Sequence, residues 1–410
     1  MRRVTRKNPP ATLNDISARA IDLSDSRWGA KFDGTTDDTN AIQDALNTGR
    51  PVLLPNRVGI ASNLTFPSGA YFHGLGISKS IIRQKAGSTG PLLSLAANWV
   101  GNIDIGDFGI DGNKDNQSAA NIGLDLDNTA DAATHRSHSA FGNSGQDPRH
   151  TISNLMIWNT KGSGLRQQGR GAGLFQRIWT MDCAGHGFEI LGYDNLYTHL
   201  DAGSSGKCGI YLSSSASSDR FTNIKSWYSG QADRSTYGQG IFLDGARSCQ
   251  FSAVEVQNSG NDGIKLLNAN FHTFSSTFIE FPPNPANTCD GLVFEDSNYN
   301  LGDFAIWDRG SSPYSLRYGM VLRKGAGAGC TGNDVRLQIQ NQQTAFVNNQ
   351  GGQSFVGNRI DVVGRYTYQA RENRGYLPSY ASDSAAATGG LSVGDTYFST
   401  ASNAYTRRQS

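Results

Sequence analysis

The sequence predicts an all-β chain that coils as a solenoid, a parallel β-helix. Two observations carry this prediction: glycine is unusually frequent, and a pair of glycine and an apolar residue recurs at long, similar intervals along the chain. Glycine makes up 49 of the 410 residues, whereas the usual share of about 7% would give about 29. Because glycine tolerates positive φ, this composition indicates many short strands joined by tight turns.

The repeated pair marks one turn of the solenoid. Between the pairs lies a second segment with alternating apolar residues, as in 152–158, 175–181 and 251–257. Two or three short strands per period fit one coil of a β-helix, whereas a β-sandwich gives strand signals every 8–12 residues without a longer period. The pairs are Gly164-Leu165, Gly187-Phe188, Gly209-Ile210, Gly240-Ile241, Gly263-Ile264, Gly291-Leu292 and Gly319-Met320.

The N-terminal elements come before this period. Residues 1–26 are basic and polar, and we expect them to form an arm. Thr36 is expected to cap a short helix, with Asp37 and Asp38 in its first turn near the positive end of the helix dipole. Residues 51–55 then form a short strand between prolines. The helix has one apolar face at helical spacing, made of Ala41, Ile42, Ala45 and Leu46.

Residues 28–43 and 51–55 resemble the opening of the pectate-lyase superfamily. The resemblance implies a right-handed parallel β-helix, in which the aspartates of the opening cap the first helix and are not catalytic. The same opening is common in bacteriophage tailspikes and other polysaccharide-active β-helices. Residues 390–398 and 404–408 resemble a C-terminal tail of many phage tail proteins, which implies a short β-hairpin.

These features divide the chain into four parts. We expect an arm for attachment to the virion over 1–26, the β-helix over 27–365, a linker over 366–390 and a hairpin tail over 391–410. Residues 126–150 interrupt the period and are expected to protrude as a loop.

Charge, hydropathy and cysteine content exclude several classes of protein. The net charge is +1, which gives no electrostatic basis for nucleic-acid or lipid binding. Apolar runs are too short for membrane insertion, and the segment 1–25 lacks the apolar core of a secretory signal. The five cysteines include no C-x-x-C pair, so a disulfide framework or zinc site is not expected, and the thiols should be buried in a reducing cytosol.

Aligning the coils on their glycines predicts one outward column of side chains on the strand that follows each glycine. Its members are the fourth residues after the glycines, and they include Asp244 and Glu295. These two lie two coils apart, so their backbones are separated by about 9–10 Å. Inverting glycosidases hold their carboxyl groups roughly 6.5–9.5 Å apart, so this is one candidate catalytic pair.

A second candidate pair, Asp201 and Glu255, lies on the middle strand. Trp179, Asp201 and Glu255 each precede the next glycine by the same interval, and Lys225 joins this column if the extra residues of its coil follow it. Lys225 would lower the pKa of neighbouring carboxyl groups, and one of the pair would need a raised pKa to act as an acid. The alternative is a solvated ladder of charges. Candidate sugar-binding residues are Trp179, Lys225, Trp227 and Tyr228.

Other motifs are interpreted as structural. Gly185-His186-Gly187 resembles a catalytic motif of polygalacturonases. The aspartate expected one coil earlier is missing, and Asp182 stands alone where that family has a pair, so His186 is expected to be structural. Asp131, His135 and His138 lie in a polar loop, and no metal site is expected there. Calcium binding, a feature of pectate lyases proper, is not expected either, and no cofactor is predicted. The acids considered for calcium are Asp104, Asp107, Asp111 and Asp115.

Together the resemblance and the columns imply a phage tailspike that binds a bacterial surface polysaccharide, capsule or lipopolysaccharide, and cleaves it by hydrolysis or elimination. The resemblance further implies a homotrimer in the virion, made in the host cytoplasm and joined to other tail proteins through its arm. Two alternatives remain: a non-catalytic receptor-binding or structural tail fibre, and a free bacterial polysaccharide-degrading enzyme. No nucleic acid and no membrane insertion are expected.

Overall fold

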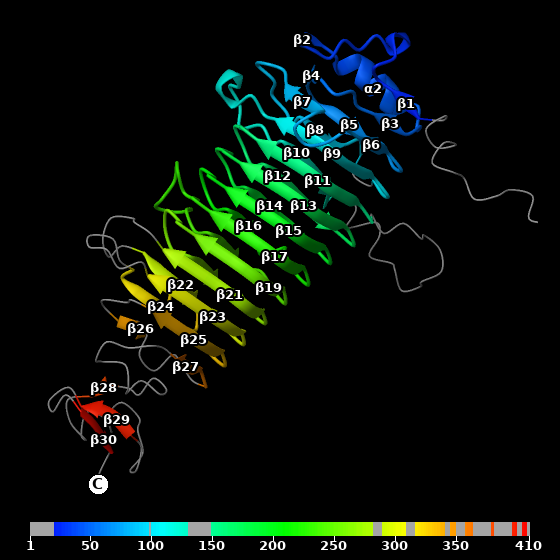
Figure 1. Cartoon of the computed structure of the whole chain (residues 1–410). Helices are drawn as coiled ribbons and strands as arrows, with labels where there is room; N and C mark the ends of the chain where they lie inside the picture. Colours follow the sequence, from blue (N-terminus) through cyan, green and yellow to red (C-terminus); the bar gives the residue numbers. More distant parts are fainter. Residues whose placement is uncertain are drawn as a thin grey trace, which may run out of the picture.

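The chain winds into a stack of parallel coils (Figure 1). The structure is a computed structural model that describes residues 20–97, 100–129, 149–281, 289–308, 316–340, 345–349, 357–363, 379–380, 396–399 and 404–407. Each coil contributes one strand to each of two large sheets, and every printed pairing within those two sheets is parallel, as in β11 with β13 and β12 with β14. The predicted parallel solenoid is confirmed.

The first sheet runs along one side of the stack. Its main path is β1 (Ile21–Asp22), β3 (Val52–Leu53), β6 (Tyr71–His73), β9 (Asp104–Asp111), β11 (Thr151–Trp158), β13 (Leu174–Met181), β15 (Leu196–Gly203), β17 (Arg220–Trp227), β19 (Gln250–Gln257), β21 (Thr273–Phe281), β23 (Leu301–Asp308), β25 (Asp334–Gln340) and β27 (Arg359–Val363). Off this path lie β2 (Asp33–Asp37), β4 (Val58–Ala61) and β7 (Ile81–Gln84).

The second sheet holds the strands that follow the repeated glycines. They are β5 (Leu64–Phe66), β8 (Leu93–Leu95), β10 (Leu124–Asn128), β12 (Leu165–Arg170), β14 (Phe188–Tyr193), β16 (Ile210–Leu212), β18 (Ile241–Asp244), β20 (Ile264–Leu267), β22 (Asp290–Glu295), β24 (Tyr318–Arg323) and β26 (Ala345–Asn349).

The recurring glycines have a steric cause. The apolar residues that follow them, from Leu165 to Met320, pair with one another coil after coil and are fully buried. A Cβ atom at Gly164, 187, 209, 240 or 291 would lie 2.6–2.9 Å from the carbonyl oxygen of the glycine one coil further on. Stacked backbones leave no room for a side chain there, so only glycine fits.

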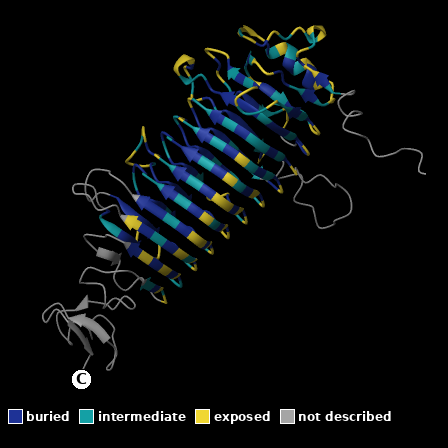
Figure 2. Cartoon of the chain, in the orientation of Figure 1, coloured by how far each residue is buried: buried dark blue, intermediate teal, exposed yellow. Residues whose placement is uncertain are grey.

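The long strands of the first sheet from β9 to β21 bend at their fourth residue. That residue has φ between 51° and 62° from β9 to β21, whereas its neighbours pair in normal register. After the bend, in strands such as β13, β17 and β19, the fifth and seventh residues are buried and the sixth and eighth point outward. Figure 2 shows this alternation as bands along the strands. The residues at the bend are Asp107, Asn154, Arg177, His199, Asn223, Ala253 and Ser276.

A polar ladder, formed by the residue just before each long strand, ties successive coils together. Its members from β15 to β27 are Asn195, Asp219, Cys249, His272, Asn300, Asn333 and Asn358. The Asn195 N–H donates to the Asp219 carboxyl (2.8 Å), the His272 N–H to the Asn300 amide oxygen (3.0 Å) and the Asn300 N–H to the Asn333 amide oxygen (2.9 Å). These bonds satisfy backbone donors that would otherwise be buried without a partner.

The helical elements are short. They are η1 (Ser26–Trp28), α2 (Thr39–Asn47) and η2 (Lys114–Asn116), and in the part of the chain that the structure describes no helix could cross a membrane. Helix α2 confirms the predicted N-terminal helix but not its cap. Thr36 lies in β2, and its hydroxyl donates to Asp33 (2.7 Å). The helix begins at Thr39, whose N–H donates to Asp37 (3.1 Å).

The two ends of the chain complete the description. Ile21 and Leu23 are buried in the body, before the expected boundary at residue 27. At the C-terminus, β29 (Thr396–Ser399) and β30 (Ala404–Arg407) pair antiparallel, which confirms the predicted hairpin. A short strand, β28 (Ser379–Tyr380), lies within the expected linker and pairs with β29. The expected protruding loop lies almost wholly outside the described residues.

Candidate functional site

The middle-strand column predicted from the sequence is present in the first sheet. Trp179, Asp201, Lys225 and Glu255 occupy the sixth position of β13, β15, β17 and β19, and each pairs in register with the next. All four are half-buried and point away from the core. Asp201 and Glu255 are thus two coils apart, or about 9–10 Å at the backbone, with Lys225 between them.

Each of the two carboxyl groups has its own partner. The Trp227 indole N–H donates to the Asp201 carboxylate (2.6 Å), and the Lys225 ammonium donates to Glu255 (3.2 Å). A Cβ atom at Gly203 would lie 2.7 Å from the Trp227 ring. The absence of a side chain at Gly203 therefore lets the indole lie over the sheet and reach back to Asp201.

The two carboxyl groups have different environments. Burial raises the pKa of Asp201; the Trp227 hydrogen bond and the Lys225 charge lower this pKa in part, and the Glu255 charge raises it. Glu255 instead lies against a cation, with 37% of its side chain exposed. The pKa of Asp201 is therefore raised by burial, whereas Glu255 lies beside the Lys225 ammonium.

Aromatic side chains extend this face in both directions along the stack. Trp158 and Trp227 occupy the eighth position of β11 and β17, and Trp307 pairs with Glu280 in the same column. With Trp179, four of the six tryptophans in the chain lie on two adjacent outward columns. The sequence analysis missed Trp158, Trp307, Gln257 and Glu280. The alternating segments 152–158 and 251–257 end on Trp158 and Gln257, so that alternation could have found these two. The register shift between β21 and β23 hides Trp307 from a count along the sequence. The amide of Gln257 donates to Glu280 (2.7 Å).

The two acids of the second predicted pair, Asp244 and Glu295, lie in one column but have different neighbours. Asp244 pairs with Leu267 and Leu267 with Glu295, as predicted. Asp244 accepts a hydrogen bond from the Tyr211 hydroxyl (3.0 Å). Glu295 instead lies between the Lys265 ammonium (3.2 Å) and the Arg323 guanidinium (3.4 Å). The leucine between the two acids and their separate partners make this pair a weaker candidate.

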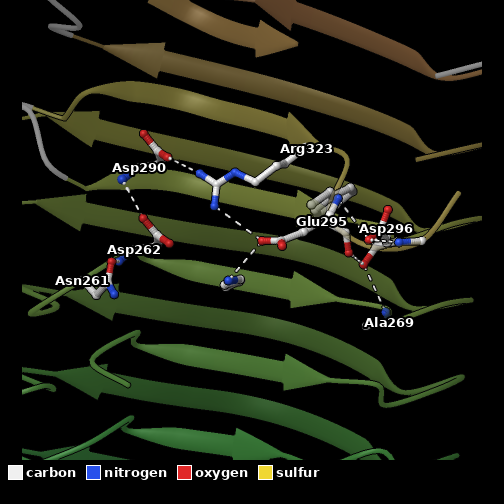
Figure 3. A network of polar contacts seen from close by, with 12 residues as sticks. Asn261, Asp262, Ala269, Asp290, Glu295, Asp296 and Arg323 are labelled. Atoms are coloured by element: carbon white, nitrogen blue, oxygen red, sulfur yellow. Dashed lines mark hydrogen bonds and ion pairs between the residues drawn. The ribbon is translucent and has the colours of Figure 1, made fainter. Parts of the chain in front are cut away.

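The surroundings of Glu295 hold the coils together (Figure 3). Arg323 lies between Glu295 and the buried Asp290, whose N–H donates to the Asp262 carboxyl (2.9 Å). Burial and the Asp290 charge raise the pKa of Asp262 to about 6. Asp296, next to Glu295, accepts backbone N–H groups from Gly325, Gly327 and Gly329 (2.8–3.1 Å). This network joins successive coils.

The motifs interpreted as structural have partners in the fold. His186 is 5% exposed, and its ring stacks on Tyr211. His73 lies between Asp104 (3.0 Å) and Asp107 (3.1 Å), and Asp111 pairs with Arg83 (2.7 Å). Within the described ranges no three metal-binding side chains cluster, and all five cysteines are buried and reduced. Asp131, His135 and His138 lie outside those ranges.

Comparisons with known proteins support the fold. No protein-family model matches the chain. It is 28% identical over 284 residues to the pre-neck appendage protein of Bacillus phage B103 and 28% identical over 204 residues to mannuronan C5-epimerase AlgE3 of Azotobacter vinelandii. These matches cover 68% and 42% of this chain, but only 25% and 11% of the two relatives.

A solved structure resembles most of the chain. The enzymatically active domain of tailspike protein 2 from bacteriophage CBA120 matches with a TM-score of 0.65 and 18% identity, over 78% of this chain and 47% of that one. At this identity the likeness concerns the fold. The chain therefore has the right-handed parallel β-helix of phage tailspikes, as the sequence predicted.

Proposed function

We propose that this chain is a phage tailspike that binds a bacterial surface polysaccharide and cleaves it by hydrolysis at Asp201 and Glu255. One observation carries the proposal: the two acids stand in one outward column, two coils apart, and burial raises the pKa of Asp201 while Glu255 is paired with Lys225. Their backbone separation of about 9–10 Å suits an inverting glycosidase, which must admit a water molecule between its carboxyl groups.

In this reaction Asp201 is the general acid and Glu255 the general base. Asp201 gives its proton to the glycosidic oxygen as the bond to the anomeric carbon breaks. Glu255 takes a proton from a water molecule, whose oxygen bonds to the opposite face of the anomeric carbon. Lys225 donates a hydrogen bond to Glu255 and so positions its carboxyl group.

The tryptophans hold the polysaccharide beside these acids. Aromatic faces bind sugar rings through their apolar surfaces, and tryptophan offers the largest one. From Trp158 on β11 to Trp307 on β23 the stack rises by six coils, or about 29 Å. A polysaccharide along this line would contact Trp179 and Trp227 near the acids, with Tyr228, 47% exposed, at the edge.

The place of this chain in a phage particle is inferred from the phage proteins that it resembles. We propose a virion component made in the host cytoplasm, trimeric, and joined to other tail proteins through residues 1–26. The identity to the phage appendage protein and the tailspike fold support this setting.

Cleavage of a panel of bacterial capsules and lipopolysaccharides tests the proposal, with product size and ultraviolet absorbance as readouts. We expect shortened chains without new absorbance, and at least a hundredfold lower rate for Asp201→Asn and Glu255→Gln. The control Asp44→Asn, at an exposed acid of α2, should cleave like the wild type. New absorbance would mean elimination and would refute the paired-acid mechanism. Binding without cleavage would mean a non-catalytic tail fibre, and a monomeric enzyme would favour the bacterial alternative.

A further inference from the structure

A cluster of aromatic rings lies on the outer side of the second sheet, away from the tryptophans. The Tyr211 ring lies 4.7 Å from His186, 5.8 Å from Tyr237 and 5.7 Å from Phe242, as measured between centroids. Tyr211 and Tyr237 remain half-exposed, whereas His186 and Phe242 are buried beneath them. The cluster therefore exposes the rings of two tyrosines, which lie on two buried rings.

An insertion brings Tyr237 to this place. The connection between β17 and β18 runs over 228–240, and it is longer than the connections one coil before and after, which run over 204–209 and 258–263. The loop is held by its own hydrogen bonds: the Ser229 hydroxyl donates to the Gly238 carbonyl (3.0 Å), and Asp233 accepts the N–H groups of Ser235 and Thr236 (3.1 Å each). Tyr237 is thus pre-positioned, which lowers the entropy cost of binding.

Polar groups of both signs border the tyrosine faces. Asp244 accepts the Tyr211 hydroxyl on one carboxylate oxygen (3.0 Å). On the other side, the Lys207 ammonium lies 4.8 Å from the Tyr237 ring centroid. A ligand between them would find one hydrogen-bond acceptor and one donor. Asp233 and Glu189 add negative charge beside Tyr237, which disfavours acidic sugars.

His186 provides the base of the cluster. Burial lowers the pKa of His186 to about 3, so the ring is neutral near pH 7, and the Lys207 charge acts in the same direction. Its Nδ1 atom is buried and has no hydrogen-bond partner among the described residues. A neutral imidazole stacked under Tyr211 supports the ring without adding charge to the surface.

From this arrangement we propose a second saccharide site, formed by Tyr211, Tyr237, Lys207 and Asp244 and specific for neutral sugar rings. Aromatic faces with a few convergent polar groups are typical of sites for such ligands. The site lies on a different sheet from Asp201 and Glu255, so it holds the polysaccharide without cutting it. The ligand class rests on the proposed function.

Surface plasmon resonance over immobilised bacterial capsules and lipopolysaccharides tests the site, with Asp201→Asn as the parent to prevent cleavage. Adding Tyr237→Ala should raise Kd about tenfold for the polysaccharide that the parent binds, and Lys207→Gln should raise it in the same direction. Tyr299→Ala is the matched control, because Tyr299 is an exposed, stacked aromatic residue of another coil. It should leave Kd unchanged.

Each result separates this site from the proposed function. If Tyr237→Ala and Lys207→Gln bind like the parent while Trp227→Ala binds weakly, the second site is refuted and the proposed function stands. If Tyr237→Ala and Lys207→Gln lose affinity while Trp227→Ala binds like the parent, the second site is supported and the tryptophan face is refuted. If the parent binds no polysaccharide of the panel, both proposals are refuted.

Discussion

The Asp219→Asn variant is expected to be more stable than the wild type near neutral pH, by an amount that grows with pH. Asp219 is the acidic member of the polar ladder and is fully buried. One of its oxygens accepts the Asn195 N–H, and the other has no partner among the described residues. Burial, mainly, raises the pKa of Asp219 from 3.8 to about 8.

The sign of the effect follows from proton linkage. Between about pH 4 and pH 8 the unfolded chain has lost the Asp219 proton while the folded chain keeps it, so stability falls as pH rises. The slope is about 1.4 kcal/mol per pH unit, and at pH 7 the accumulated loss is up to about 4 kcal/mol. Asparagine removes this loss, and it already fills the same position as Asn195, Asn300, Asn333 and Asn358.

Urea unfolding of both proteins at several pH values between 4 and 8 measures this difference. We expect similar stability at pH 4 and an advantage for Asp219→Asn that approaches about 4 kcal/mol at pH 7. Burial lowers the pKa values of His150, His186 and His272, but this affects both proteins equally. Asp44→Asn on the exposed face of α2 is the control. A difference that does not change with pH would refute the reasoning.

Two further variants test the site and the coil geometry. Trp227→Phe keeps an aromatic ring but removes the hydrogen bond that lowers the pKa of Asp201. This pKa should rise, so the alkaline limb of the pH–rate profile should move to higher pH, because the general acid stays protonated longer. Gly187→Ala places a Cβ atom 2.7 Å from the Gly209 carbonyl oxygen and from the Thr180 hydroxyl, and should lower the free energy of unfolding by about 1–3 kcal/mol in denaturant titrations.

Controls separate these effects from general damage. For Trp227→Phe, an unchanged or lowered alkaline limb would mean that Asp201 is not the acid of the reaction. For Gly187→Ala, the exposed Thr222→Ala is the control and should change the free energy of unfolding by less than about 0.5 kcal/mol. Equal stability of the two variants would contradict the steric origin of the repeated glycines.

The sequence by itself determined the coils and their register. The repeated glycine at the start of strands such as β12, β14 and β16 is required because stacked backbones approach too closely for a Cβ atom, as Gly187 shows. The sequence therefore shows a glycine followed by an apolar residue at long, similar intervals. Counting from it placed Asp201 and Glu255 in one column, whereas Lys225 joined them only because the extra residues of its coil follow it.

Tertiary structure alone decided what surrounds those residues. The bond between Trp227 and Asp201, the cations beside Glu295 and the contact of Asp219 with Asn195 all join side chains or backbone groups of different coils. The position of Tyr237 over Tyr211 depends on the path of a loop. Loop length varies between coils, so a local sequence pattern does not show which side chains meet. The pKa of a side chain depends on its burial, so a local pattern does not show its protonation state either.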